Sequence, residues 1–403
     1  MSKWQMRPLG ELCLIERGGS PRPIDKYITE DPNGINWIKI GDTTESMYIT
    51  RTKEKIIPEG MKKSRYVQKG DFLLSNSMSF GRPYILDIDG CIHDGWLVIR
   101  DNDGLFDKRF LYYFLGSPVT YQKFKSMAVG GVVNNLNIDM VKKVHVPVLP
   151  ITEQVEIADR LDKVTNLINY RKEQVQNLDD LVKSRFIELF GMPGSDTNGW
   201  GITTLGSVCQ VNPKKGQDKR LVGDLEVSFV PMPAVSERGE IDPSEVRAYD
   251  TVKTGFTYFA ENDVLFAKIT PCMENGKGAV ARSLHNGIGF GSTEFHVLRP
   301  LQGKSDPYWI YTLTSFSEFR SDAASNMTGS AGQRRVPATF LEQYRVSVPP
   351  MQLQEQFATF VEQTDKLKFA VQNAADLQTM LILNLANYHW KHWASVSDKG
   401  VKL

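Results

Sequence analysis

The sequence predicts a mixed α/β protein that contains two copies of one globular domain, each followed by a long helix. Three observations lead to this prediction. Framework segments recur about 200 residues apart, short β-type runs alternate with helical stretches inside each copy, and each copy ends on prolines followed by an apolar heptad pattern. The chain has 403 residues, which is long enough for two or three domains with sizeable cores.

The duplication is visible as matching segments in the same order. The pairs are "PLGELCLIERGGSPRP" (8–23) with "TLGSVCQVNPKKGQ" (204–217), "RYVQKGDFLLSNSMSFGRPYI" (65–85) with "TYFAENDVLFAKITPCMENGKGAV" (257–280), "GWLVIRD" (95–101) with "EFHVLRP" (294–300), and the segments 130–150 with 329–350. A single repeat of this length indicates a duplicated domain and not a solenoid. The stretches between the matching segments differ freely.

Short β-type runs such as "DFLLS", "WLVIR" and "DVLFAKI" are bounded by Gly, Asp, Asn and Pro, as strands are. Helical stretches follow the last runs of each copy, at 108–116, 119–125 and 307–324. We therefore expect four segments: a first α/β domain over 1–150, a helix over 151–193, a second α/β domain over 194–350, and a helix and tail over 351–403.

Each domain ends in prolines, a Glu-Gln pair and then a helix. In the first exit, "PVLPITEQVEIADRLDKV", Thr152 is the expected N-cap and Glu153 lies in the first turn, where the helix dipole favours a carboxylate. In the second exit, "SVPPMQLQEQFATFVEQTDKL", the Glu-Gln pair stands farther from the prolines. Gly191, Pro193 and Gly194 end the first helix and form a linker.

Both helices carry apolar residues at alternating spacings of three and four, which is the pattern of a coiled-coil seam. The first seam is Ile157, Leu161, Val164, Ile168, Arg171, Val175, Leu178, Val182, Arg185 and Leu189. The second is Phe357, Phe360, Thr364, Leu367, Val371, Ala374, Gln378, Leu381, Leu385 and Tyr388. One such helix alone would expose its seam, whereas two can bury their seams against each other. The alternative, that each helix packs on its own domain, stays open.

Composition limits the class of protein and its location. Hydrophobic residues make up 41% and charged residues 24%, as in ordinary globular proteins, and no apolar run approaches the length of a membrane span. We expect no signal segment at the N-terminus and no disulfide framework among the four scattered cysteines, so a cytoplasmic location is expected. With a net charge of +1, any polyanion must bind to local positive charge.

The order of these features, from framework, proline exit and Glu-Gln to a long helix ending in "KSRFIELFG" (183–191), and then the whole again, resembles the specificity (S) subunit of type I restriction–modification systems. The resemblance covers essentially the full chain. It implies that each α/β domain is a target recognition domain that reads one half of a split DNA site. The second copy departs from the pattern, because its helix ends in "NYHWKHW".

The resemblance also implies the partners. Double-stranded DNA is the ligand, and the two long helices pair as antiparallel spacers between the domains and set the gap in the site. Two modification subunits, which are adenine methyltransferases that use S-adenosylmethionine, would dock on this chain, and restriction/translocase subunits would join them. No membrane and no cofactor of its own are implied for this chain.

Catalytic motifs are missing from the sequence. The nearest match to the [D/N]-P-P-[Y/F] loop of adenine methyltransferases is "VNPKK", and "CMENGKG" lacks the first glycine and the hydroxyl of a phosphate loop. "HDG" at His93 and "STEFH" at Ser292 read better as strand-edge polar groups than as catalytic pairs. His389 and His392 share a helix face, but an aromatic cap or a partner contact fits "YHWKHW" better than a metal site does. We expect no catalytic residue and no metal.

Base reading requires side chains with paired donors and acceptors, on loops where the two copies diverge. The candidates follow equivalent strands or precede the exit strands. In the first copy they are Asn76, Ser77, Met78, Arg82, Asn134 and Asn135, and in the second they are Lys268, Thr270, Asn275, Lys277, Gln333, Arg334 and Arg335. For each, an ordinary turn residue is the alternative.

Residues 1–150 hold 21 basic and 17 acidic residues, and residues 194–350 hold 16 basic and 17 acidic residues. Neither domain has a large net charge, so contacts to the DNA backbone need local clusters of positive charge. The candidates are Ser20, Arg22, Lys62, Lys63, Arg65, Lys142, Lys143, Lys214 and Lys215. A solvated surface is the alternative for each cluster. For the whole chain, the alternatives are a stand-alone DNA methyltransferase or nuclease with degenerate motifs, and a protein scaffold that does not read DNA.

Overall fold

A computed structural model describes residues 5–77, 80–128, 135–330 and 332–397, with the side chains of the last helix described as far as Leu381. The chain forms two compact units. Unit 1 comprises Met1–Tyr170 and Ala374–Leu403, and unit 2 comprises Arg171–Asn373. Each long helix therefore contributes one half to each unit.

The described residues of unit 1 form two five-stranded sheets and a two-stranded ribbon. The ribbon pairs β1 with β12, one sheet has the order β3-β6-β4-β10-β7, and the other has the order β2-β11-β8-β9-β5. The elements are β1 (Gln5–Pro8), α1 (Leu9–Leu12), β2 (Leu14–Arg17), β3 (Ile28–Thr29), β4 (Ile35–Ile38), β5 (Tyr48–Ile49), β6 (Glu54–Ile56), α2 (Pro58–Met61), β7 (Arg65–Val67), β8 (Phe72–Ser75), β9 (Pro83–Leu86), β10 (Gly90–Ile92), β11 (Trp96–Arg100), α3 (Lys108–Leu115), α4 (Pro118–Ala128), α5 (Ile138–Lys142), β12 (His145–Val148) and α6 (Ile151–Phe190).

Unit 2 repeats this plan with four-stranded sheets. The ribbon pairs β13 with β22, and the sheets have the orders β14-β21-β18-β19 and β16-β15-β20-β17. The elements are β13 (Ile202–Thr204), β14 (Cys209–Val211), β15 (Glu226–Val230), β16 (Val246–Ala248), α7 (Tyr249–Val252), β17 (Thr257–Ala260), β18 (Val264–Ala267), β19 (Gly278–Val280), β20 (Ile288–Gly291), β21 (Phe295–Pro300), α8 (Pro307–Ser315), α9 (Ser317–Ser325), α10 (Ala338–Gln343), β22 (Arg345–Ser347) and α11 (Met351–Ser397).

The two units share the frame that the matching sequence segments predict. The order β2-β11-β8-β9 in unit 1 corresponds to β14-β21-β18-β19 in unit 2, and the ribbon β1-β12 corresponds to β13-β22. In both units an arginine of one strand, β11 or β21, forms an ion pair with the aspartate that precedes the neighbouring strand, β8 or β18. Arg100 Nη2 lies 2.7 Å from Asp71 Oδ2, and Arg299 Nη2 lies 2.6 Å from Asp263 Oδ2. The predicted duplication of a mixed α/β domain is confirmed.

A buried glutamine fixes the start of each long helix. The side chain of Gln154 accepts from the Asp107 N–H and donates to the carbonyls of Leu105 and Leu149. Gln354 makes the same set with Asp306, Lys304 and Pro349. The equivalent of Gln154 is therefore Gln354 and not the glutamine of the second Glu-Gln pair, Gln356, so the two exits have the same spacing after their last proline.

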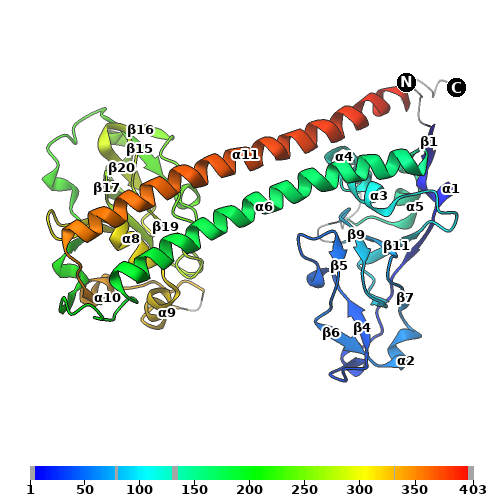
Figure 1. Cartoon of the computed structure of the whole chain (residues 1–403), viewed down its shortest axis with the longest axis horizontal. Helices are drawn as coiled ribbons and strands as arrows, with labels where there is room; N and C mark the ends of the chain where they lie inside the picture. Colours follow the sequence, from blue (N-terminus) through cyan, green and yellow to red (C-terminus); the bar gives the residue numbers. More distant parts are fainter. Residues whose placement is uncertain (1–4, 78–79, 129–134, 331, 398–403) are drawn as a thin grey trace. The chain divides into compact units, whose positions relative to one another are not determined.

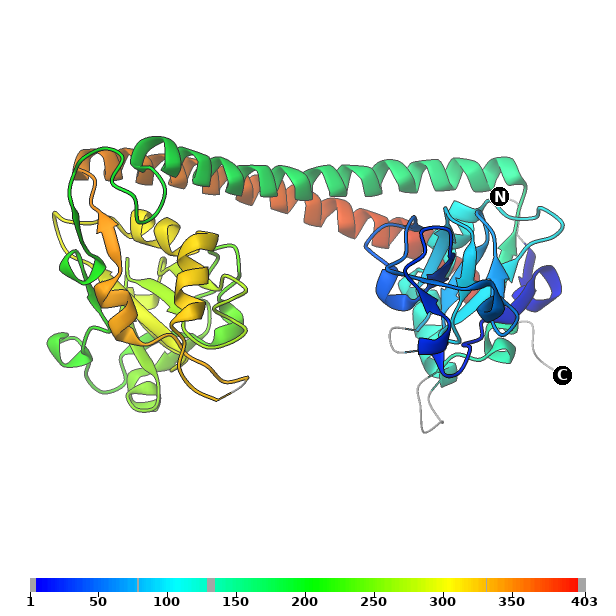
Figure 2. The same ribbon diagram turned by 90° about the horizontal axis from the view of Figure 1, so that it is seen from below.

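Within unit 2, α6 and α11 run side by side in both views (Figures 1 and 2). Phe186 of α6 packs edge-on against Phe357 of α11, with ring centroids 5.6 Å apart. Lys368 Nζ lies 3.0 Å from Asp179 Oδ1. The residue numbers rise along one helix as they fall along the other, so the pair is antiparallel, as expected.

The predicted seam of α11 is wrong at two of its described positions. Leu367 is 58% exposed and Leu381 is 49% exposed, whereas Val361 and Ala375 are buried. Lys368 takes the inner position next to Leu367, because its ammonium group is held by Asp179 and Asp365. The helix carries apolar residues on more than one face, and sequence spacing alone does not say which face is covered. Leu385 and Tyr388 lie outside the described side chains.

Candidate nucleic-acid interface

In unit 2 the two predicted base-reading segments lie against each other. The N–H of Thr270 donates to the carbonyl of Arg334 at 3.1 Å, and the N–H of Val336 donates to the carbonyl of Lys268 at 2.9 Å. An antiparallel bridge joins Ile269 and Arg335. The structure thus brings into two adjoining segments the predicted residues Lys268, Thr270, Asn275, Lys277, Gln333, Arg334 and Arg335.

The two arginines of this surface differ in how firmly they are held. Arg335 donates through Nε and Nη2 to the two carboxylate oxygens of Glu294, at 2.9 and 2.8 Å. These hydrogen bonds from Arg335 lower the pKa of Glu294. Arg334 is exposed, and its Nη2 lies 3.3 Å from Glu274 Oε1. Exposed pairs of this kind contribute little free energy, so the contact with Glu274 leaves Arg334 available to another partner.

The remaining candidates of unit 2 are less uniform. Asn275 and Gln333 are exposed, as a base-reading side chain must be. Lys277 donates weakly to the carbonyl of Met232, at 3.4 Å. The Thr270 hydroxyl is buried and has no hydrogen-bond partner among the described residues. Thr270 is therefore the weakest candidate of this group in the present conformation.

In unit 1, Asn76 occupies the position that Lys268 has in unit 2. The N–H of Asn76 donates to the carbonyl of Gly95 and that of Lys268 to the carbonyl of Glu294, both at 2.9 Å. The Asn76 side chain is only 2% exposed, and its Nδ2 donates to the carbonyl of Asp94 at 3.0 Å. Its amide is directed into the protein, so in this conformation it holds the loop and reaches no base edge.

The other candidates of unit 1 are placed as follows. Ser77 is half-buried, Arg82 is exposed, and the Arg82 N–H donates to Ser75 Oγ at 2.9 Å. Asn135 is exposed. Met78 and Asn134 lie outside the described residues.

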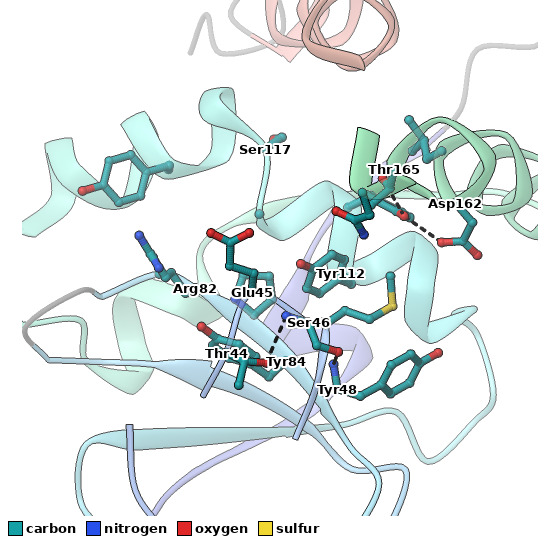
Figure 3. Close-up of a pocket in the computed structure, with 18 of the residues that line it drawn as sticks. Thr44, Glu45, Ser46, Tyr48, Arg82, Tyr84, Tyr112, Ser117, Asp162 and Thr165 are labelled. Atoms are coloured by element: carbon teal, nitrogen blue, oxygen red, sulfur yellow. Dashed lines mark hydrogen bonds between the residues drawn. The ribbon is translucent and has the colours of Figure 1, made fainter. Parts of the chain in front are cut away.

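Arg82 lines a hollow of about 1200 Å³, the tyrosine hollow, between the loops around Met47 and Gly81, helices α3 and α4, and the first half of α6. Figure 3 shows Arg82, Tyr84 and Tyr112 on the wall formed by the domain, with Asp162 and Thr165 of α6 opposite. The Tyr113 hydroxyl donates to Asp162 Oδ1 at 2.7 Å, which joins α3 to α6 at the hollow. These tyrosines come from separate segments of the chain, so no local sequence pattern predicted that they lie together.

The predicted backbone-binding residues of unit 1 are mostly engaged within the protein. Ser20 Oγ donates to Asp94 Oδ1 at 2.9 Å, and Arg22, which is well exposed, lies 3.6 Å from the same carboxylate. Lys63 Nζ donates to the Tyr27 hydroxyl at 2.7 Å. Arg65 Nη1 lies 2.6 Å from Glu16 Oε1.

Four further predicted lysines and Lys62 are exposed. Lys142 and Lys143 lie at the end of α5, where positive charge also suits the helix dipole. Lys214 and Lys215 follow β14 in unit 2 and line a second hollow together with Lys253 and Lys268. Lys253 is not among the residues predicted from the sequence, because it lies about 40 residues along the chain from Lys214, beyond the range of any local pattern.

The described residues contain neither a metal-binding cluster nor a membrane-spanning helix. Over residues 5–77, 80–128, 135–330 and 332–397, no three histidine, cysteine, aspartate or glutamate side chains are grouped to hold a metal ion. Within the same ranges, no helix is both long and apolar enough to cross a membrane. The side chains of His389 and His392 lie outside the described part of the last helix.

The duplicated frame agrees with the comparisons to known proteins. The model of the "Type I restriction modification DNA specificity domain" matches residues 1–177 and again residues 197–378. Together these matches cover most of the 403 residues. The chain therefore belongs to the type I restriction–modification DNA specificity family and carries two copies of its domain.

Two curated relatives from Escherichia coli are similar over parts of the chain. The type I restriction enzyme EcoAI specificity subunit is 36% identical over 193 residues, which are 47% of this chain and 32% of that protein. The EcoEI specificity subunit is 40% identical over 153 residues, which are 38% of this chain and 25% of that protein. The matched part thus spans about a third or less of the length of each relative.

Among solved structures, a chain described under complex assembly and conformational transition of the type I R-M system is similar over nearly the whole length. The TM-score is 0.56 with 18% identity, and 95% of this chain and 96% of that chain are covered. At this identity the likeness shows a shared fold.

Proposed function

We propose that this chain is the non-catalytic DNA sequence-specificity subunit of a type I restriction–modification complex. Each α/β domain reads one half of a split target in double-stranded DNA. The observation that carries the proposal is one frame used twice with different side chains on it. The same backbone hydrogen bonds hold Asn76 in unit 1 and Lys268 in unit 2, at the ends of equivalent strands. Loops on a rigid frame are where recognition residues lie.

The long helices supply the second part of the proposal. Their paired seams set the gap between the two half-sites, and their outer faces dock two adenine methyltransferase subunits, with restriction/translocase subunits joining the complex. Exposed apolar side chains on the outside of α11 support docking: Leu367, Phe369, Leu377, Met380 and Leu381. Groups of exposed apolar side chains mark surfaces that bind other proteins.

Catalysis would then belong to the partners. S-adenosylmethionine would bind to the methyltransferase subunits, the proposed complex acts in the cytoplasm, and this chain contributes recognition and assembly.

The test is to express the chain with the methyltransferase subunit encoded beside it and to sequence methylated adenines in the host DNA. We expect one split motif with a fixed gap, absent when either protein is omitted. The purified chain alone, with S-adenosylmethionine and DNA, should transfer no methyl group. Transfer by the chain alone would favour a stand-alone methyltransferase, and a complex that assembles without methylating any motif would favour a scaffold.

A further inference from the structure

Unit 2 contains a hollow of about 540 Å³, the lysine hollow, that gathers positive charge from three separate segments. Lys214 and Lys215 follow β14, Lys253 follows α7, and Lys268 follows β18. No aspartate or glutamate is among the described residues that line it. Four ammonium groups around one small space repel one another unless an anion joins them.

The charges of the lysine hollow are largely unneutralised. Among the described residues, Lys253 has the one ion pair, with Asp250 at 3.0 Å, and both groups are exposed. Lys215 Nζ donates to the carbonyl of Lys253, which leaves its charge uncompensated. Glu294 is the carboxylate whose charge acts on Lys268, but Arg335 already binds both of its oxygens. Burial lowers the pKa of Lys268, so an anion in the hollow would stabilise its charged form.

The hollow is lined by four lysines, by the hydroxyls of Thr254, Thr257 and Tyr258, and by one amide, so hydrogen-bond donors outnumber acceptors. The one amide on its wall, Asn212, is engaged, because its Oδ1 accepts from the Val297 N–H at 3.1 Å and its Nδ2 lies 3.0 Å from His296 Nδ1. Base edges present both donors and acceptors, whereas phosphate oxygens only accept. Phe256, 37% exposed on the same wall, suits the apolar side of a sugar. The chemistry of the wall fits a phosphodiester better than a base.

Unit 1 has no such charge at its corresponding loop. The hollow after β2, about 770 Å³, is lined by two cationic side chains, Arg22 and Lys39, and by four carboxylates, those of Asp25, Glu30, Glu54 and Asp94. Lys39 pairs with Glu54, and Arg22 lies 3.6 Å from Asp94. The balance of two positive and four negative charges disfavours a phosphate there.

We propose that the lysine hollow binds phosphate groups of the DNA backbone beside the half-site that unit 2 reads, and that unit 1 has no equivalent clamp at its mixed-charge hollow. The inference rests on the proposed function. It assigns Lys268 to a phosphate and not to a base. The two units therefore hold the DNA backbone differently. Unit 2 binds it through the positive charge of the lysine hollow, and the mixed-charge hollow of unit 1 contributes less positive charge.

The test uses the full chain assembled with its methyltransferase subunits, and DNA duplexes that carry the methylated motif found in the host. Affinity is measured over a series of salt concentrations for wild type and for Lys214→Ala/Lys215→Ala/Lys253→Ala. The slope of log K against log salt should fall by about 2 to 3, at roughly 0.9 per lost phosphate contact. The matched variant with arginine at the same three positions should keep the wild-type slope. Arg22→Ala/Lys39→Ala in unit 1 should change it by less than about 1. Thermal unfolding of each variant checks that the fold is kept.

Lys268→Ala separates the two roles of that lysine. If it binds phosphate, affinity falls by the same factor for the target and for duplexes with single changes in the half-site. Loss of discrimination at one base pair would overturn its assignment to phosphate. An unchanged salt slope in the triple alanine variant would overturn the whole inference while leaving the proposed function intact.

Free phosphate is the other source of the same chemistry. If inorganic phosphate protects wild type but not the triple alanine variant from thermal unfolding, and the DNA salt slope is the same for both, the hollow serves a free anion and the inference is overturned. Failure of the proposed function looks different. In that case the wild-type complex binds the motif no more tightly than a duplex with both half-sites replaced.

Discussion

Gln154 and Gln354 each form hydrogen bonds with three backbone groups at the point where a domain passes into its long helix. Both side chains are fully buried. Each accepts from the N–H of an aspartate, Asp107 or Asp306, whose side chain in turn caps the next helix, α3 or α8. The glutamines therefore tie the exit helix to the cap of a domain helix, which fixes the direction of the exit.

We predict that Gln354→Ala lowers the free energy of unfolding by about 2–4 kcal/mol, because it removes a fully buried side chain and leaves the Asp306 N–H and the carbonyls of Lys304 and Pro349 without their protein partner. Gln154→Ala should have an effect of the same size. Gln356→Ala, in the exposed Glu-Gln pair, should change it by no more than about 0.5 kcal/mol. Denaturant unfolding measures all three. Equal effects of the Gln354 and Gln356 variants would contradict the equivalence of Gln354 with Gln154.

His296 is buried between the loop that follows β14 and the segment before α10. Its Nε2 lies 2.8 Å from the carbonyl of Val336, to which it donates, and Asn212 faces its Nδ1. Burial lowers the pKa of His296, with the charges of Lys268 and Glu294 acting in opposite directions on it. The native state therefore holds this imidazole neutral where the unfolded chain would protonate it.

The consequence is a loss of stability on acidification. Above the unfolded pKa of about 6.5 neither state binds the proton, so His296 adds no pH dependence there. As the pH falls below about 6.5, the unfolded state binds a proton that the native state resists, and the free energy of unfolding decreases. We predict that between pH 7 and pH 5 wild type loses more stability than His296→Gln. Denaturant unfolding at both pH values measures the losses, and equal losses in the two proteins would contradict the assignment to His296.

At the scale of the helix, α11 has two kinds of apolar residue. Val361 and Ala375 are buried with Phe357 on the inner face, and Leu377 and Met380 are more than 60% exposed. Lys368, which is held by Asp179 and Asp365, lies among the inner residues. The inner face stabilises the fold of the chain, and the outer face is available to a partner.

We predict that Val361→Ala lowers the free energy of unfolding by roughly 2 kcal/mol, because it removes buried methyl groups, whereas Leu377→Gln leaves it within about 0.5 kcal/mol. For binding of the methyltransferase subunit, the proposed docking role predicts that the exposed residues matter most. Leu377→Gln together with Met380→Gln should reduce the amount of methyltransferase subunit that copurifies with the chain by ten-fold or more. Copurification at the wild-type level would show that these residues lie outside the docking surface.

At the scale of the molecule, a net charge of +1 gives no general attraction to DNA. Binding must depend on local features of each domain, such as the lysine hollow of unit 2. Each unit has its own sheets and its own core. Independent cores allow one domain to change without unfolding the other.

We predict that replacing residues 1–150 by the equivalent domain of a relative changes one half of the methylated motif and keeps the other half and the gap. Sequencing of methylated adenines in cells that express the hybrid with its methyltransferase subunit measures this. The reciprocal exchange of residues 194–350 should change the opposite half. A hybrid in which both halves change would mean that the domains do not read DNA independently.

The sequence by itself determined the mixed α/β class, the duplication, the two long helices and the family. These features follow from local patterns: strand-like runs bounded by turn residues, prolines that end a strand, and apolar residues at heptad spacing. Matching segments in one order then imply one frame used twice. The antiparallel pairing came from the family resemblance and is borne out by Phe186 against Phe357 and Asp179 against Lys368.

Only the tertiary structure decided which side chains face which partner. Leu367 and Lys368 are neighbours, and the covered face of α11 is set by α6 and not by hydrophobicity, so the lysine is inside and the leucine outside. Asn76 and Lys268 follow equivalent strands, yet Asn76 is buried with its amide bonded to the Asp94 carbonyl, whereas Lys268 lines the lysine hollow. Lys214, Lys253 and Lys268 meet because β14, α7 and β18 are brought together by the folded frame. Such meetings depend on contacts between residues far apart in the chain, and no local pattern encodes them.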